Sequence, residues 1–262
     1  MRKLSLVFLV LTLAIVTSSV YASPTAYVFT GSQEWGTMNL TTGVFTSLGN
    51  AGIQVTGLGT AGGNVYGELW KGGTLYQINV TNGSLTIIGS DSVDFNGLGS
   101  TPTGLYGYDA SNQNLYSINP STGAATLLGS TGIALGTCDG MSVGPGGLYL
   151  AMDYGAGSLL YLLNTTNGSA TLVGDTGVPG IGAMVWIGGV LYAGNDFGTL
   201  SVWTLNTTTG LGTLVANTSG MPDNFWGLAP VPTPVPEPSS LLCLGSGLTG
   251  VVAATRRKLR RK

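Results

Sequence analysis

The sequence contains no histidine and few charged residues, since only 8% of its 262 residues are Asp, Glu, Lys or Arg. Without histidine, the chain cannot build a Ser-His-Asp or Cys-His catalytic centre, or a metal site with imidazole ligands. Its two cysteines, Cys138 and Cys243, are too few for a disulfide framework. Cys138 is interpreted as a small, buried, apolar side chain.

Basic residues are almost missing from the central part of the chain. Lys71 is the only one between residues 23 and 235, which also contain ten acidic residues and therefore carry a net charge of −9. Such a domain repels phosphate backbones, which argues against nucleic-acid binding. One lysine and no arginine also leave phosphate and carboxylate substrates without a clamp. None of the glycine-rich stretches lies between a strand and a helix, so the many glycines predict no nucleotide site.

The other basic residues lie at the two ends of the chain. Arg2 and Lys3 precede the apolar run Leu4–Val16, and the stretch SSVYA follows, ending at Ala22. This order is typical of a secretory signal peptide that is cleaved after a small residue. We therefore predict that residues 1–22 are a signal peptide and that the protein is exported. The alternative is an uncleaved anchor helix.

The C-terminal end begins with a proline-rich linker, Val231–Pro238 (VPTPVPEP), which predicts extended backbone. The uncharged apolar segment Ser239–Thr255 follows and would span about 25 Å as a helix, slightly less than the ~30 Å hydrocarbon core. Snorkelling basic side chains could close this difference. The segment therefore predicts a short transmembrane helix with a cytoplasmic basic end. That basic end comprises Arg256, Arg257, Lys258, Arg260, Arg261 and Lys262.

This end of the chain resembles the PEP-CTERM sorting signal, in which a Pro-Glu-Pro motif (here Pro236, Glu237 and Pro238), a short membrane segment and an arginine-rich terminus follow one another. The resemblance implies that an exosortase in the inner membrane of a Gram-negative bacterium recognises the motif and removes the tail. It also implies delivery to the cell surface or medium, and association with exopolysaccharide and biofilm matrix. The alternative is a chance proline-rich linker before an ordinary C-terminal anchor.

A repeat of about 40 residues organises residues 23–231. Its clearest unit is Leu115–Gly129 (LYSINPSTGAATLLG), which predicts two short strands joined by a turn. The turn asparagines of the five copies are Asn39, Asn79, Asn119, Asn164 and Asn206. Out of phase with this hairpin, a small residue precedes a large apolar one at Gly57-Leu58, Gly97-Leu98, Gly140-Met141, Ala183-Met184 and Gly227-Leu228. Short strands at this period indicate propeller blades.

Each repeat predicts four strands, and the strand with the small-apolar pair suits the crowded propeller axis. Tyr27–Gly49 supplies three strands and Phe225–Pro230 supplies one, so that joining them completes a fifth blade. We therefore predict an all-β, five-bladed β-propeller of four-stranded antiparallel blades over residues 23–231, with residues 232–262 as the sorting tail. The hairpins also resemble those of secreted bacterial propellers. An outer-membrane barrel would need longer strands, and a parallel β-helix would need a shorter repeat.

In such a ring, every second connection lies on the same face, and the acidic residues all fall in or beside the connections of one face. Carboxylates accept hydrogen bonds from sugar hydroxyls or bind Ca²⁺, and aromatic rings pack on pyranose rings. The predicted ligand face contains Glu34, Trp35, Glu68, Trp70, Asp109, Asp139, Asp153, Tyr154, Asp175, Asp196, Asp223 and Trp226. The alternative is that the charges only solubilise loops and the aromatic rings pack between blades.

Three functions follow from this pattern. The first is a non-catalytic surface or matrix protein that requires no cofactor, Ca²⁺ aside, and associates with polysaccharide. The second is a secreted glycoside hydrolase with two carboxylates, Asp139, Asp175 or Asp223 paired with Glu34 or Glu68. The third is a structural module of the matrix without a small ligand.

Overall fold

The computed structural model describes residues 23–90, 92–136, 140–155 and 157–231. Twenty strands in five four-stranded antiparallel sheets make up the regular structure of these residues. The described residues contain no helix that is long and apolar enough to cross a membrane. The predicted signal peptide, sorting motif, membrane segment and basic tail lie outside the described residues, as do Asp91, Cys138 and Asp139.

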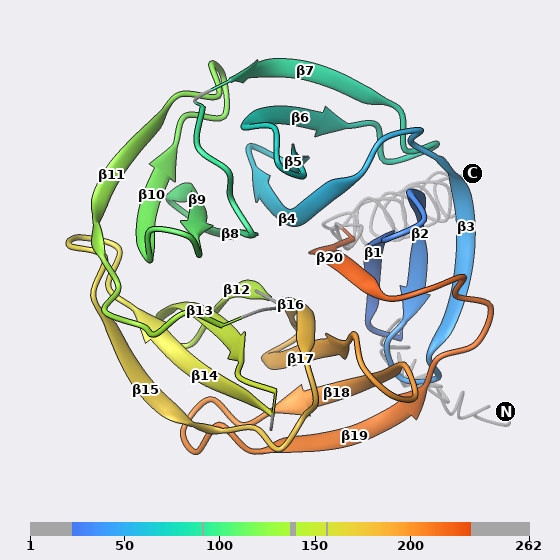
Figure 1. Ribbon diagram of the computed structural model, residues 1–262. Helices are drawn as coiled ribbons and strands as arrows, with labels where there is room; N and C mark the ends of the chain where they lie inside the picture. The colour runs from blue at the N-terminus through green and yellow to red at the C-terminus, as the bar shows by residue number, and fades with distance from the viewer. Residues whose placement is uncertain (1–22, 91, 137–139, 156, 232–262) are drawn as a thin grey trace, which may run out of the picture.

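The five sheets are the blades of a propeller, as the repeat predicted (Figure 1). The first blade contains β20 (Phe225–Pro230), β1 (Thr25–Thr30), β2 (Glu34–Asn39) and β3 (Val44–Asn50). The second contains β4 (Val55–Ala61), β5 (Asn64–Leu69), β6 (Thr74–Ile78) and β7 (Leu85–Ser90). The third contains β8 (Gly97–Thr101), β9 (Gly104–Asp109), β10 (Asn114–Ile118) and β11 (Ala125–Ser130).

The fourth blade contains β12 (Met141–Gly144), β13 (Gly147–Asp153), β14 (Ser158–Leu163) and β15 (Ala170–Asp175). The fifth contains β16 (Ile181–Ile187), β17 (Val190–Asn195), β18 (Ser201–Leu205) and β19 (Gly212–Asn217). Figure 1 shows β4, β8, β12, β16 and β20 around the central axis, and β3, β7, β11, β15 and β19 at the circumference.

The two ends of the described chain close the ring, which confirms the predicted closure. Strand β20 pairs antiparallel with β1, with Val28 opposite Leu228. A second contact joins the outer edges of the fifth and first blades, where the Phe45 N–H donates to the Ser219 carbonyl at 2.9 Å and the Ser219 N–H donates to the Gly43 carbonyl at 2.9 Å. The first blade is therefore fastened at its inner and outer edges by residues from opposite ends of the sequence.

The hydrophobic core is divided into five clusters, one between each pair of adjacent blades. The large member of each small-apolar pair is buried in one of them. The small member is explained by the close approach of neighbouring innermost strands: a Cβ on Gly57 would lie 2.2 Å from the Leu98 backbone nitrogen of the next blade. Because each blade buries both faces against its neighbours, a single repeat would not fold alone.

Glycines also let the blades meet at their outer edges. Gly174 ends the repeated motif of β15, and a Cβ there would lie 2.0 Å from the Thr209 carbonyl oxygen in the next blade's hairpin turn. Gly49, Gly89 and Gly129 approach the next turn in the same way. In the fifth blade, Ala216 stands at this position, opposite Val202. The glycine at this position of the outermost strands is thus explained by the close contact with the next blade, and not by a requirement of the strand itself.

Candidate functional site

All described carboxylates lie at one rim of the propeller, as predicted. This rim, formed by the connections that join the second strand of each blade to the third and each blade to the next, is called the acidic face. Its described carboxylates are Glu34, Glu68, Asp94, Asp109, Asp153, Asp175, Asp196 and Asp223, and Lys71 lies there too. The opposite rim, formed by the turns between the first and second and the third and fourth strands, contains no charged residue within the described chain and is called the neutral face.

Three of the predicted ligand carboxylates are buried rather than exposed on the acidic face. Glu68, Asp109 and Asp153 are only 1–3% exposed. Glu68 accepts a hydrogen bond from the Phe95 N–H at 3.0 Å. Asp109 accepts two from Asn112, from the backbone N–H at 3.0 Å and the side-chain amide at 2.7 Å. These two groups satisfy backbone and side-chain donors of the connections, which is a structural role.

Trp35 is fully buried as well. Its ring stacks on Tyr27 with centroids 5.0 Å apart, and its indole N–H donates to the Val80 carbonyl of the next blade at 3.2 Å. For this residue the structure favours the alternative in which the aromatic ring packs between blades.

Three of the predicted ligand residues do converge, near the axis of the acidic face. Trp70, Asp196 and Trp226 line a cavity of about 160 Å³, here called the tryptophan pocket, together with Thr56, Asn96, Gly182 and Phe225. The two indole rings meet edge to face with centroids 5.4 Å apart, and Trp70 remains 40% exposed. One Asp196 oxygen accepts the Phe225 N–H at 3.0 Å. The pocket therefore combines exposed aromatic surface with one carboxylate and neutral polar groups.

The remaining predicted residues lie elsewhere on the acidic face. Glu34 accepts hydrogen bonds from Ser47 at 2.5 Å and Asn50 at 3.2 Å within the first blade. Tyr154 donates to the Ala134 carbonyl at 3.2 Å, and Asp175 accepts the Gly177 N–H at 2.9 Å. Asp223 precedes β20 and does not line the pocket. No group of three or more Cys, Asp or Glu side chains that could hold a metal ion occurs among the described residues.

The fold is shared with solved structures of low sequence identity. A chain of the nidogen/laminin complex is similar with a TM-score of 0.56 and 11% identity, over 78% of this chain and 97% of that one. A protein of unknown function from Bacteroides thetaiotaomicron is similar with a TM-score of 0.55 and 15% identity, over 79% of this chain and 62% of that one. No curated protein sequence matches the chain. These similarities identify a β-propeller and nothing about its ligand.

The C-terminal end is identified more narrowly. Residues 234–258 match the PEP-CTERM protein-sorting motif, which confirms the resemblance found in the sequence. The protein is thus a five-bladed propeller followed by a PEP-CTERM motif. The motif implies an exported protein that is anchored at its C-terminal end and processed by an exosortase.

Proposed function

We propose that this protein is a non-catalytic, extracellular binding propeller that associates with exopolysaccharide through the tryptophan pocket. The observation that carries the proposal is the convergence of Trp70, Asp196 and Trp226, which come from the second, fifth and first blades. Indole rings offer flat apolar surface to the C–H face of a sugar ring. The Asp196 carboxylate and the Asn96 amide supply acceptors and donors for hydroxyl groups.

The arrangement of the carboxylates supports binding over hydrolysis. Glycoside hydrolysis needs a pair of carboxyl groups roughly 5–9.5 Å apart on either side of the scissile bond. Asp196 is the only carboxylate among the described residues that line the pocket. Glu68, one of the proposed catalytic partners, is buried and accepts a backbone hydrogen bond. A secreted glycoside hydrolase remains the alternative that the experiment must test.

Replacing Trp70 with alanine is expected to weaken binding of exopolysaccharide extracted from the cells that make the protein by at least tenfold. The reason is that a tryptophan side chain that the bound ligand covers commonly contributes about 2 kcal/mol or more to the free energy of binding. Co-sedimentation with the polysaccharide measures the effect. Phe197→Ala is the control, because Phe197 is 50% exposed on the same face but does not line the pocket.

Equal binding by wild type and Trp70→Ala would contradict the assignment of the pocket. Release of new reducing ends from the polysaccharide by the wild type would replace the binding function with the enzymatic one.

Replacing Pro236, Glu237 and Pro238 together with alanine is expected to prevent C-terminal processing, since these residues form the sorting motif. Intact-mass measurement of the protein from its native cells should then show the unprocessed C-terminus in the membrane fraction. Pro232→Ala is the matched control, because this proline precedes the matched residues 234–258. Normal processing of the triple variant would show that the motif is not read by an exosortase.

A further inference from the structure

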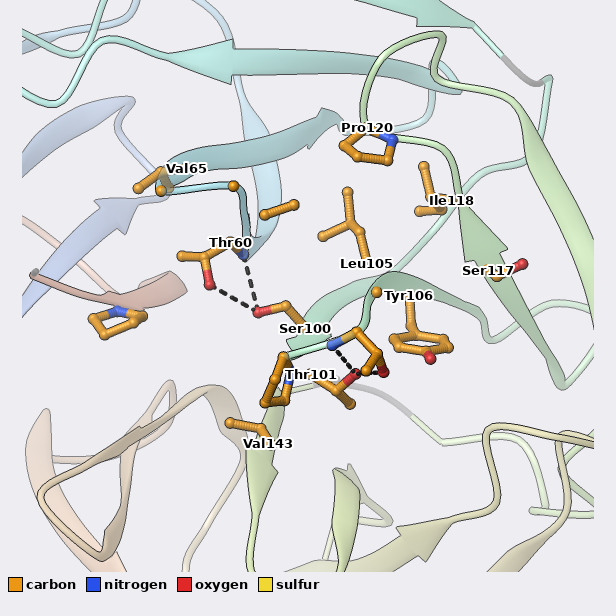
Figure 2. A pocket seen from close by; sticks show the side chains of 17 residues that line it. Thr60, Val65, Ser100, Thr101, Leu105, Tyr106, Ser117, Ile118, Pro120 and Val143 are labelled. Atoms are coloured by element: carbon orange, nitrogen blue, oxygen red, sulfur yellow. Dashed lines mark hydrogen bonds between the residues drawn. The ribbon is translucent and has the colours of Figure 1, made fainter.

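A larger cavity, of about 660 Å³, opens on the neutral face between the second and third blades (Figure 2). We call it the neutral groove. Thr60 and Val65 of the second blade lie across the hollow from Tyr106 and Ile118 of the third blade. Its volume is within the range of about 300–1,000 Å³ that small-molecule sites occupy. It lies at the opposite rim from the tryptophan pocket and shares no residue with it.

A small side chain stands opposite Tyr106 in the lining of the groove, as Thr37 and Thr204 stand opposite the equivalent tyrosines of the first and fifth blades. Tyr106 is paired across the strands with Ser117, whereas the equivalent Tyr149 of the fourth blade is paired with Leu162. The small Ser117 leaves space where the neighbouring blade has a leucine. At the innermost strands, Ser100 accepts a hydrogen bond from the Thr60 N–H at 3.0 Å, and the two hydroxyls are 3.1 Å apart. This pair fastens the second blade to the third beneath the hollow without filling it.

Two prolines lie in the turns at the rim of the groove. Pro102 lies in the turn between β8 and β9, and Pro120 lies in the hairpin turn between β10 and β11. Proline fixes one backbone dihedral angle at each position, so less conformational entropy is lost when a ligand binds.

The lining is both apolar and hydroxyl-bearing, and it is uncharged. Val65, Leu105 and Ile118 supply apolar surface. The hydroxyls of Tyr106 and Ser117 have no hydrogen-bond partner within the described part of the chain, while the equivalent Tyr149 hydroxyl donates to the Pro145 carbonyl at 2.8 Å. Burial raises the pKa of Tyr149, and hydrogen bonding to Thr207 partly offsets that rise. Tyr106 thus keeps a donor and an acceptor for a ligand.

These properties select an uncharged ligand with both C–H and hydroxyl surface. A charged ligand would give up hydration without finding an opposite charge, because the described charged side chains all lie at the acidic face. A purely apolar ligand would leave the two hydroxyls without partners. We propose that the neutral groove binds a neutral saccharide chain, with the sugar C–H face on Leu105 and Ile118 and its hydroxyls bonded to Tyr106 and Ser117. This second site goes beyond the polysaccharide binding proposed for the acidic face.

The test uses isothermal titration of the purified protein with neutral glucan, mannan and galactan oligosaccharides. Ser117→Leu introduces into the groove the larger side chain that the fourth blade has at the equivalent position, Leu162, and it should weaken binding of the neutral oligosaccharide at least tenfold. Tyr106→Phe removes one hydroxyl that has no internal partner, and it should weaken binding about threefold to tenfold. The matched controls are Thr37→Leu and Tyr66→Phe, which change the equivalent positions of other blades and do not line the groove.

The expected result is that at least one neutral oligosaccharide binds, that acidic oligogalacturonate does not compete with it, and that only the two groove variants weaken the binding. Because Trp70→Ala leaves the neutral groove intact, it should leave this binding unchanged, which separates the groove from the acidic-face proposal. An unchanged melting temperature shows that each variant is folded. The proposal is overturned if no neutral oligosaccharide binds, or if wild type and Ser117→Leu bind it equally well.

Discussion

A chain that ends at Asn224 is expected to lose its cooperative fold, whereas one that ends at Val231 is expected to keep it. The short form lacks β20, the innermost strand of the first blade and the partner of β1. It also removes two core side chains, those of the fully buried Phe225 and the 3% exposed Leu228. Burial of each of these side chains contributes about 1.5–3 kcal/mol to the free energy of unfolding, and the short form also loses the packing and strand pairing of β20. The sum is a large part of a total free energy of unfolding of about 5–15 kcal/mol.

Thermal unfolding of both forms, each starting at Ser23 and followed by circular dichroism, measures this difference. The chain that ends at Val231 is the control, because it contains all twenty strands. Similar cooperative transitions for the two forms would contradict closure of the ring by β20.

Replacing Gly174 with alanine is expected to reduce the free energy of unfolding by about 3 kcal/mol, because overpacking against backbone costs this much when neither element can move away. The new Cβ would lie 2.0 Å from the Thr209 carbonyl oxygen, so two blades would have to separate. Urea unfolding measures the loss.

The control is Ala216→Gly, the reverse change at the equivalent position of the fifth blade. Glycine there costs roughly 0.5–1 kcal/mol through backbone entropy alone. If both substitutions changed stability by a similar small amount, the close blade contact would not constrain this position.

The architecture could be predicted from the sequence because the repeat makes each physical requirement visible five times. Asparagine and glycine mark the hairpin turns: in the third blade, the Ser121 N–H donates to the Asn119 side chain at 2.9 Å, and Gly123 adopts a positive φ of 75°. The small-apolar pairs mark the innermost strands. The single strand Phe225–Pro230 completes the blade that lacks one.

The site was predicted less well, because sequence position gives the rim but not the direction of a side chain. Glu68 and Asp109 lie at the predicted rim, but their carboxylates accept hydrogen bonds from the connections. Trp70, Asp196 and Trp226 belong to three blades, and only the closed ring brings them to one pocket. Thr56 and Trp226 each directly precede the small-apolar pair of an innermost strand, and both line the pocket. This shared position in neighbouring blades is the signal that could have identified the pocket.

The neutral groove could not be found by searching for reactive residues. Its lining is uncharged and includes the small side chain of Ser117, and such residues form no chemical motif. Comparison of the repeats does not single out Ser117, because Thr37 and Thr204 stand at the equivalent positions of the first and fifth blades.

Closure of the first blade by both chain ends also places both ends of the described chain at the same rim of the ring. Strand β1 begins and strand β20 ends at the neutral face. There the Leu40 N–H donates a hydrogen bond to the Pro24 carbonyl at 2.9 Å. The matched sorting motif begins at residue 234, three residues after Val231. The described chain therefore ends at the rim on which the neutral groove opens, and Pro230 of β20 lines that groove. Because all twenty strands precede the matched motif, removal of the tail would leave every strand of the ring in place.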